Sequence, residues 1–222
     1  ICSKNLISTT FELGGKSPLI IDKDSNLKIA AKRVCLGKFI NCGQTCIAPD
    51  YLFVHKEVKE EFINLSQGEI IFGGKHDERN NYISPTLIKP YELNNSLMQD
   101  EIFGPILPIL EFENIESVIE YINKRPRPLA LYYFGNKNIN IIKRTTSGGA
   151  CINDAIMHII PHNLPFGGIG QSGMGSYHGK KSFDTFSHYK SVLKTHKNFE
   201  FKIKYPPYTS LKQKIIRLFM DR

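Results

Sequence analysis

The sequence predicts an α/β domain built on a largely parallel sheet that is covered by helices. Short apolar runs, typical of buried strands, alternate along the chain with segments whose apolar residues recur at helical spacing. The chain has 222 residues, of which 41% are hydrophobic and 23% charged, so it can bury one sizeable core. It shows no internal repeat and no low-complexity tract.

The first predicted strand and helix lead into a glycine turn. Residues 19–21 form an apolar run followed by charged residues, which predicts a buried strand. Asp24 or Ser25 is expected to cap the helix that follows. The inner face of this helix has five residues at helical spacing: Leu27, Ala30, Ala31, Val34 and Cys35. We expect the helix to deliver the chain into a turn at Gly43 and to leave Cys46 in a loop.

The remaining elements continue the alternation of strands and helices. Further strands are predicted at residues 51–54, 69–72, 82–88, 106–112, 129–134 and 150–152. Further helices are predicted at residues 57–65, 115–122 behind an Asn114 cap, 139–145 and 210–220. A glycine-rich turning loop is predicted at residues 165–179, and an extended ribbon at residues 190–204.

The cysteines and the hydropathy pattern indicate a protein of a reducing compartment. Five cysteines make an odd count without the spacing of a disulfide framework. Cys35, Cys42 and Cys151 are interpreted as small buried hydrophobes. The most apolar stretch, residues 102–110, is too short and too broken by glycine and proline to span a bilayer. No secretory leader pattern is found at the start of the chain, so a cytoplasmic location is expected.

The positive charge is concentrated at one end of the chain. The formal net charge is +8, and residues 190–222 hold nine Lys or Arg against two acidic residues. A basic tail on a nearly neutral body favours a local contact, such as the anionic cytoplasmic face of an internal membrane. The predicted helix at residues 210–220 is basic and amphipathic, which suits a membrane interface as well as it suits ordinary packing. Nucleic acid is not expected, because no recognition signature accompanies the charge.

Cys46 and Glu12 are the candidate catalytic residues. Cys46 ends the run Asn-Cys-Gly-Gln-Thr-Cys, and Glu12 lies 34 residues upstream beside a double glycine. A thiol can attack an acyl carbon, and a carboxylate can take the proton of a water that later releases the acyl group. The alternative is that Cys46 is structural and Glu12 is a solvated surface charge, and composition by itself favours that alternative.

Three other arrangements are weaker candidates. A cysteine-protease site would need His178 and Asn153 as partners of Cys46, and neither lies in a protease-like context. The Gly168–Gly173 run matches a dinucleotide motif by letter only, because no strand precedes it. His158 and His162 have a zinc-like spacing, but Pro161 would interrupt their helix and no third ligand is indicated. We therefore expect no metal.

Two signatures in order give a strong resemblance to a known family. Residues 12–18 (Glu-Leu-Gly-Gly-Lys-Ser-Pro) and 43–46 (Gly-Gln-Thr-Cys) resemble the active-site signatures of the aldehyde dehydrogenase superfamily. Residues 48–51, 172–183 and 204–207 resemble the class 3 branch, which includes fatty aldehyde dehydrogenases. The resemblance extends from about Phe11 to the C-terminus. It implies a three-layer catalytic domain of the aldehyde dehydrogenase type with a C-terminal extended oligomerisation arm.

The resemblance also implies roles for individual residues. Cys46 would be the nucleophile that forms a thiohemiacetal and then a thioester, and Glu12 would activate the hydrolytic water. Residues 99–105 resemble the family's Glu-Ile-Phe-Gly-Pro run. Glu101 would hold the ribose hydroxyls of NAD or NADP, and Phe103 would pack near the nicotinamide ring. The implied substrate is an aliphatic aldehyde, of medium or long chain.

The resemblance predicts a divided and shortened chain. Residues 1–11 would be a remnant of the cofactor-binding domain, 12–188 the catalytic domain, 189–207 the oligomerisation arm of a homodimer, and 208–222 the basic helix. Most of the cofactor site would then lie outside this chain. Residues 57–72 pass between elements in fewer residues than family members need, which predicts an internal deletion. The alternative to an enzyme is an inactive fragment that only associates with a full-length subunit or a membrane.

Overall fold

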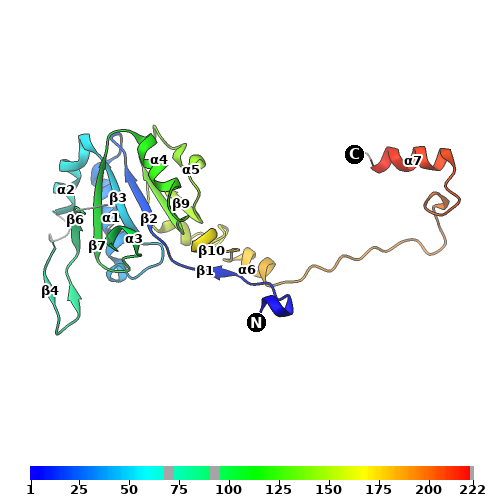
Figure 1. Cartoon of the computed structure of the whole chain (residues 1–222), viewed down its shortest axis with the longest axis horizontal. Helices are drawn as coiled ribbons and strands as arrows, with labels where there is room; N and C mark the ends of the chain where they lie inside the picture. The colour runs from blue at the N-terminus through cyan, green and yellow to red at the C-terminus, as the bar shows by residue number, and fades with distance from the viewer. Residues whose placement is uncertain (68–72, 91–95, 221–222) are drawn as a thin grey trace. The chain divides into compact units, whose positions relative to one another are not determined.

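The computed structural model describes residues 1–67, 73–90 and 96–220 (Figure 1). The chain forms two compact units, Ile1–Ser187 and His188–Arg222, and each is described by itself. The larger unit carries the sheet, and the smaller one carries the C-terminal helix. The strand predicted at residues 69–72 lies outside the described residues.

A parallel sheet forms the centre of the larger unit (Figure 1). In the described part of the chain it has six strands, in the order β6-β7-β3-β2-β8-β9. Every neighbouring pair of these strands is parallel. The strands are β2 (Ser17–Ile21), β3 (Pro49–His55), β6 (Thr86–Ile88), β7 (Ile106–Phe112), β8 (Ala130–Phe134) and β9 (Gly149–Ile152). The predicted α/β class is thereby confirmed.

Helices cover both faces of the sheet, as two adjacent residues of β2 show. Leu19 packs in a buried cluster with residues of α1 and α2. Ile20 packs in a second cluster with residues of α3, α4 and α5. Successive side chains of a strand point to opposite faces, so the two clusters are the two cores of a three-layer fold. The helices are α1 (Leu27–Phe39), α2 (Lys59–Gln67), α3 (Ser96–Gln99), α4 (Ile115–Asn123) and α5 (Ile141–Arg144).

The cap of α1 differs from the prediction. Asn26 caps the helix, and its Oδ1 accepts a hydrogen bond from the Ile29 N–H at 3.2 Å. Asp24 instead accepts the backbone N–H groups of Asn136 and Lys137 at 3.1 and 3.0 Å. The predicted Asp24 cap is wrong, because the Asp24 carboxylate binds the loop that follows β8. The predicted Asn114 cap of α4 is confirmed by a bond of 2.9 Å from the Glu116 N–H.

The single strand predicted at residues 82–88 is two strands. β5 (Tyr82–Ile83) pairs antiparallel with β4 (His76–Asp77), whereas β6 joins the main sheet beside β7. Pro85 separates β5 from β6, because proline lacks the N–H that a continuous strand would donate. Two short helices, α3 and α6 (Lys180–Thr185), were not predicted.

The smaller unit contains α7 (Ser210–Met220), at the residues that the sequence predicts. The ribbon predicted at residues 190–204 forms no strand among the described residues, and Lys202–Lys204 form a 3₁₀ turn. An extended segment becomes a strand only when another strand pairs with it, and this unit offers none in its described residues. No helix in the described ranges combines the length and apolarity needed to cross a membrane.

Candidate active site

Three segments that precede neighbouring strands form the candidate active site. Glu12 precedes β2, Cys46 precedes β3, and Glu101 and Phe103 precede β7. Because these three strands are adjacent and parallel, the segments before them lie at the same edge of the sheet. The carboxylates of Glu12 and Glu101 both act electrostatically on the Cys46 thiol. The structure therefore brings together three of the four site residues that the sequence singled out, and Phe103 lies two residues beyond Glu101.

Glu12 is held by a short strand pair outside the main sheet. β1 (Phe11–Glu12) pairs antiparallel with β10 (Gly173–Met174), with Glu12 opposite Gly173. The Leu13 N–H then donates to the Ser172 carbonyl at 3.0 Å. The Glu12 side chain is half-buried and hydrogen-bonded to the Cys46 thiol, and its Oε1 is buried without a partner. An acceptor oxygen is thus free beside the sulfur.

Cys46 is a protonated thiol at neutral pH. Burial, followed by the negative charge and the hydrogen bond of Glu12, raises the pKa of the Cys46 thiol to about 11. The thiolate is the nucleophilic form, and none of the residues that the structure describes contributes a positive charge that lowers the pKa of this thiol. Attack on a carbonyl carbon therefore requires a base, and the Glu12 carboxylate in contact with the thiol is in position to act as one.

The loop before Cys46 is shaped by residues in left-handed conformations. Asn41, Cys42 and Gly43 have φ of 51°, 56° and 77°. A side chain on Gly43 would overlap the carbonyl of Gly104, so only glycine lets this loop approach the Glu101–Phe103 segment. Cys42 is exposed in this turn, which corrects the prediction that it is buried.

The Glu101 carboxylate lies against the double glycine that follows Glu12. The Gly15 N–H donates to it, and a Cβ on Gly14 would overlap its Oε2. Partial burial of the carboxylate raises its pKa, although the residue as a whole is exposed. Phe103 is half exposed and has a φ of 44°, an unfavourable conformation for an aromatic residue. Gly14 and Gly15 thus form a cradle for the Glu101 side chain.

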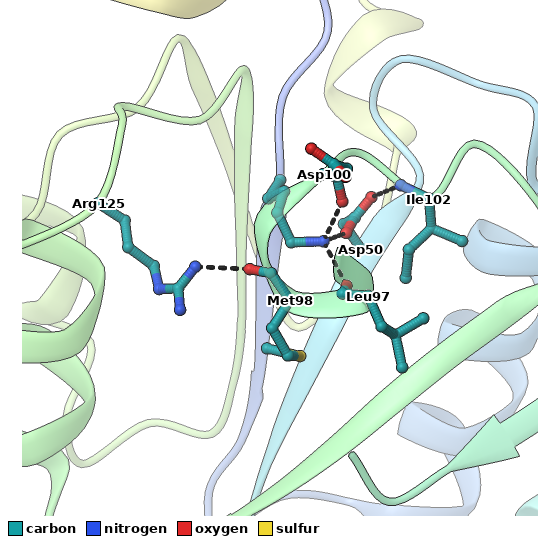
Figure 2. A network of polar contacts seen from close by, with 7 residues as sticks. Asp50, Leu97, Met98, Asp100, Ile102 and Arg125 are labelled. Carbon is teal, nitrogen blue, oxygen red and sulfur yellow. Dashed lines mark hydrogen bonds and ion pairs between the residues drawn. The ribbon is translucent and has the colours of Figure 1, made fainter. Parts of the chain in front are cut away.

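A pocket of about 560 Å³ lies beside this cradle. Glu101 and the double glycine form one part of its lining, and Tyr121, Arg125 and Arg127 form another. The Arg125 guanidinium donates to the Met98 carbonyl at 2.7 Å (Figure 2). The pocket is large enough for the nicotinamide–ribose half of a dinucleotide, and Glu101 offers it a hydrogen-bond acceptor.

Four residues to which the sequence analysis gave no role lie around the candidate catalytic residues. Lys16 and Asp50 form an ion pair, and Lys38 is fully buried beside them. The Tyr132 hydroxyl donates to the carbonyl of Ile47, directly after Cys46, at 2.6 Å. One signal was available in the sequence. Lys38 lies four residues after Val34, on the apolar face of the predicted helix, where a lysine is unusual.

The weaker candidates do not assemble. Asn153 follows β9, so it lies at the opposite edge of the sheet from Cys46, and its amide bonds the backbone of Gly135. His158 contacts Cys151 at 3.3 Å, whereas His162 packs on His178. No group of three or more metal-ligating side chains converges within the part of the chain that the structure describes. The Gly168–Gly173 run leads into a 3₁₀ turn and the two-residue β10.

Fold and site together define a class: an α/β protein with a cysteine thiol beside a carboxylate at the amino edge of a parallel sheet. The model of the aldehyde dehydrogenase family matches residues 1–67 and 65–192. The chain is 42% identical over 257 residues to a 4,4'-diaponeurosporen-aldehyde dehydrogenase of Staphylococcus aureus. That alignment covers 98% of this chain and 56% of the relative. This chain is also 44% identical to the rat aldehyde dehydrogenase family 3 member A2, in an alignment that covers 98% of this chain and 53% of that relative.

A solved structure gives the same result. The substrate-bound state of Staphylococcus aureus AldH matches with a TM-score of 0.94 and 40% identity, over 99% of this chain and 56% of that one. The chain belongs to the aldehyde dehydrogenase family, and its similar relatives include family 3 members. It spans about half the length of the curated relatives it matches.

The relatives contain an internal segment that this chain lacks. The alignment with the S. aureus relative is longer than the whole 222-residue chain, so it contains residues without a counterpart here. The two parts of the family match meet at residues 65–67, which fall within the link from residue 57 to residue 72. This finding supports the predicted internal deletion.

Proposed function

We propose that the protein to which this chain belongs oxidises aldehydes to carboxylic acids, with a nicotinamide dinucleotide as hydride acceptor. The observation that carries the proposal is the contact between the Cys46 thiol and the Glu12 carboxylate. A base in contact with a protonated nucleophile is the arrangement that covalent catalysis at a carbonyl carbon requires. Membership of the aldehyde dehydrogenase family supports the choice of aldehyde as substrate.

Glu12 has two roles in this proposal. It first takes the proton of the Cys46 thiol, and the thiolate forms a bond to the carbonyl carbon, giving the alkoxide form of a thiohemiacetal. Loss of a hydride, which the nicotinamide cofactor would accept, converts this alkoxide to a thioester. Glu12, after releasing its proton, then takes a proton from water, and the resulting hydroxide attacks the thioester carbonyl. The carbon–sulfur bond breaks, the carboxylic acid leaves, and the proton returns the sulfur to a thiol.

The residues present fit a nicotinamide cofactor. Glu101 borders the pocket of about 560 Å³ and lies against Gly14 and Gly15. A Cβ on Gly14 would overlap the Glu101 carboxylate. In our proposal the Glu101 carboxylate accepts the ribose hydroxyls, and Phe103 packs near the ring. The cofactor supplies hydride acceptance when bound. A Bacillus cereus aldehyde dehydrogenase in an NAD⁺ complex, 26% identical with a TM-score of 0.77, supports cofactor use but leaves NAD and NADP as alternatives.

The proposed substrates are aliphatic aldehydes of medium or long chain. Support comes from the class 3 runs of the sequence and from the similarity to a family 3 member A2 protein. We also propose a homodimer in which residues 189–207 act as an arm, and a peripheral membrane contact through residues 208–222 at a cytoplasmic face. A rat relative named as dimeric and NADP-preferring, 40% identical over 92% of this chain, is consistent with the dimer.

A second candidate is an inactive chain that only associates with a full-length subunit or a membrane. The observation that favours it is the set of aligned positions of the S. aureus relative that have no counterpart in this chain. Aldehyde-dependent NADH and NADPH formation separates the two candidates. It should be measured for the 222-residue chain and for the protein translated from the whole transcript, with hexanal and dodecanal as substrates.

The variants Cys46→Ser and Glu12→Gln test the mechanism in the same assay. We expect both to abolish turnover of the active form, with Cys42→Ser as the matched control that retains it. Undiminished oxidation by Cys46→Ser would contradict the proposed mechanism. Absence of oxidation in every form of the protein would favour the associating candidate.

A further inference from the structure

A buried hydroxyl holds the chain directly after Cys46. The Tyr132 side chain is fully buried, and its hydroxyl donates to the carbonyl of Ile47 at 2.6 Å. Ile47 is only 2% exposed, so its carbonyl has little access to water. A buried carbonyl that loses its hydrogen bond costs free energy, and the backbone shifts until the carbonyl finds another partner. The position of Ile47, and of Cys46 one residue before it, therefore depends on this hydroxyl.

The Tyr132 ring is itself fixed by its neighbours. On β8 it lies opposite Leu19 of β2 and Cys151 of β9, and it belongs to the core cluster against which Cys46 packs. The centroid of the His158 ring lies 6.0 Å from that of Tyr132, and the Nδ1 of His158 contacts the Sγ of Cys151 at 3.3 Å. A side chain packed in this way keeps one rotamer, so its hydroxyl is a fixed point for the backbone that it binds.

This bond ties the loop that carries Cys46 to a distant strand. Two other bonds stay within the loop: the Asn41 side chain donates to the Gln44 carbonyl, and the Ala48 N–H donates to the Thr45 carbonyl, both at 2.9 Å. Such local bonds shape the loop without attaching it to the sheet. The Tyr132 hydroxyl instead reaches the loop from β8, which is separated from β3 by β2.

We propose that Tyr132 is a positioning residue, whose hydroxyl fixes the loop so that the Cys46 thiol stays in contact with the Glu12 carboxylate. The catalytic meaning of that contact rests on the proposed function, whereas the anchoring of the loop does not. Without the hydroxyl, the thiol should become more exposed and should move away from the carboxylate. Both changes favour the thiolate, because burial and Glu12 are the two largest causes that raise the thiol pKa to about 11. The same changes should impair every step in which Glu12 moves a proton beside the sulfur.

The next residue of β8 supplies a matched control. Tyr133 is also fully buried, and its hydroxyl donates to the Oδ2 of Asp22 at 2.8 Å. Asp22 follows β2, so this bond lies at the opposite edge of the sheet from Cys46. Tyr132→Phe and Tyr133→Phe each remove one buried hydroxyl from the same strand, and only Tyr132→Phe affects the loop. A role confined to the stability of the core would make the two variants alike.

Three measurements on the 222-residue chain compare both variants with wild type. In Tyr132→Phe, we expect protection from hydrogen exchange to fall about tenfold in the peptide that covers residues 44–50. Alkylation of Cys46 by iodoacetamide at pH 8 should become about tenfold faster, because more thiolate is present. After acetylation with p-nitrophenyl acetate, the acetyl group should leave Cys46 about tenfold more slowly, because Glu12 no longer lies beside the sulfur to activate water. Tyr133→Phe should match wild type in all three.

Faster alkylation together with slower loss of the acetyl group would support the positioning role. Equal results for the two variants would overturn it. So would a Tyr132→Phe chain that fails to fold while Tyr133→Phe folds, because the hydroxyl would then serve the core and not the loop. If wild-type Cys46 never carries the acetyl group, the proposed function fails, and exchange and alkylation still decide the role of Tyr132.

Discussion

At the residue scale, the Glu12 carboxylate helps to keep the Cys46 thiol protonated at neutral pH. The carboxylate accepts the thiol proton, and the same negative charge makes the thiolate harder to form. In the proposed mechanism, activation is therefore a proton transfer within the pair, and not a permanent lowering of the thiol pKa by a cation. The Oε1 of Glu12 has no hydrogen-bond partner, so it can accept a hydrogen bond from a second donor, such as a water molecule.

This arrangement predicts how the reactivity of Cys46 depends on pH. Glu12→Gln removes a negative charge and a charged acceptor, so the thiol pKa should fall from about 11 toward the ordinary 9.0. We expect the midpoint of the pH–rate profile of alkylation by iodoacetamide to move to lower pH. Mass spectrometry of the Cys46 peptide measures this rate. Glu101→Gln is the control, with a smaller shift, because Glu101 is the weakest of the causes that raise the pKa. A midpoint that stays in place or rises would contradict the assigned contact.

The sequence revealed the candidate catalytic and cofactor-binding residues through motifs, but not the residues that surround them. Glu12, Cys46 and Glu101 could be found because each lies in a recognisable run. Lys38 lies in no motif, and its burial depends on how α1 packs against β3 in the folded chain. The pKa of Cys46 could not be predicted from the sequence either, because it depends on the burial of the thiol and on its distance from Glu12 in the folded chain.

At the element scale, helix caps show where local sequence is sufficient. Asn114 caps α4 as predicted, since its nearest partner is the helix itself. Asp24 satisfies the cap pattern equally well, but the tertiary fold brings the loop after β8 to its carboxylate. The ribbon predicted at residues 190–204 makes the same point, because a strand there needs a pairing strand, and the described residues of its own unit offer none.

The Asn26 cap of α1 can be tested by measuring the free energy of unfolding. Asn26→Ala removes the acceptor of the Ile29 N–H, and should lower the free energy of unfolding by about 1 kcal/mol. Urea unfolding followed by circular dichroism measures the change. Asn114→Ala should give a loss of similar size, and Lys28→Ala, at an exposed position, should change little. A loss for Ser25→Ala with none for Asn26→Ala would restore the cap that the sequence predicted.

At the scale of the whole molecule, the buried lysine makes stability depend on pH. The folded-state pKa of Lys38 is about 8, below its ordinary 10.5, so the unfolded chain binds more protons between these values. The free energy of unfolding should therefore rise with pH across this window, by at most about 3 kcal/mol. The rise is measured as the difference between wild type and Lys38→Met in urea unfolding at pH 7, 8, 9 and 10. A difference that is constant with pH would show that Lys38 titrates normally.

The basic C-terminal unit predicts a membrane contact that depends on salt. α7 exposes apolar residues within its own unit (Leu211, Leu218 and Phe219) and also carries basic side chains. Co-sedimentation with vesicles of phosphatidylcholine and phosphatidylserine should be strong at low salt and weak at high salt. Replacement of Lys212, Lys214 and Arg217 by Gln should abolish it. Equal sedimentation after removal of residues 209–222 would place the contact elsewhere.

The pairing of Cys46 with Glu12 as nucleophile and base is tested most directly with an activated ester, because ester cleavage passes through a thioester without hydride transfer. The chain is incubated with p-nitrophenyl acetate, and intact-protein and peptide mass spectrometry locate the acyl group. We predict that Glu12→Gln acquires the acetyl group on Cys46 more slowly than wild type and then keeps it, because both the attack and the hydrolysis use the carboxylate, and that Cys46→Ser acquires none there. Acetylation that spares Cys46, or that leaves Glu12→Gln as quickly as wild type, would contradict the roles assigned to these two residues.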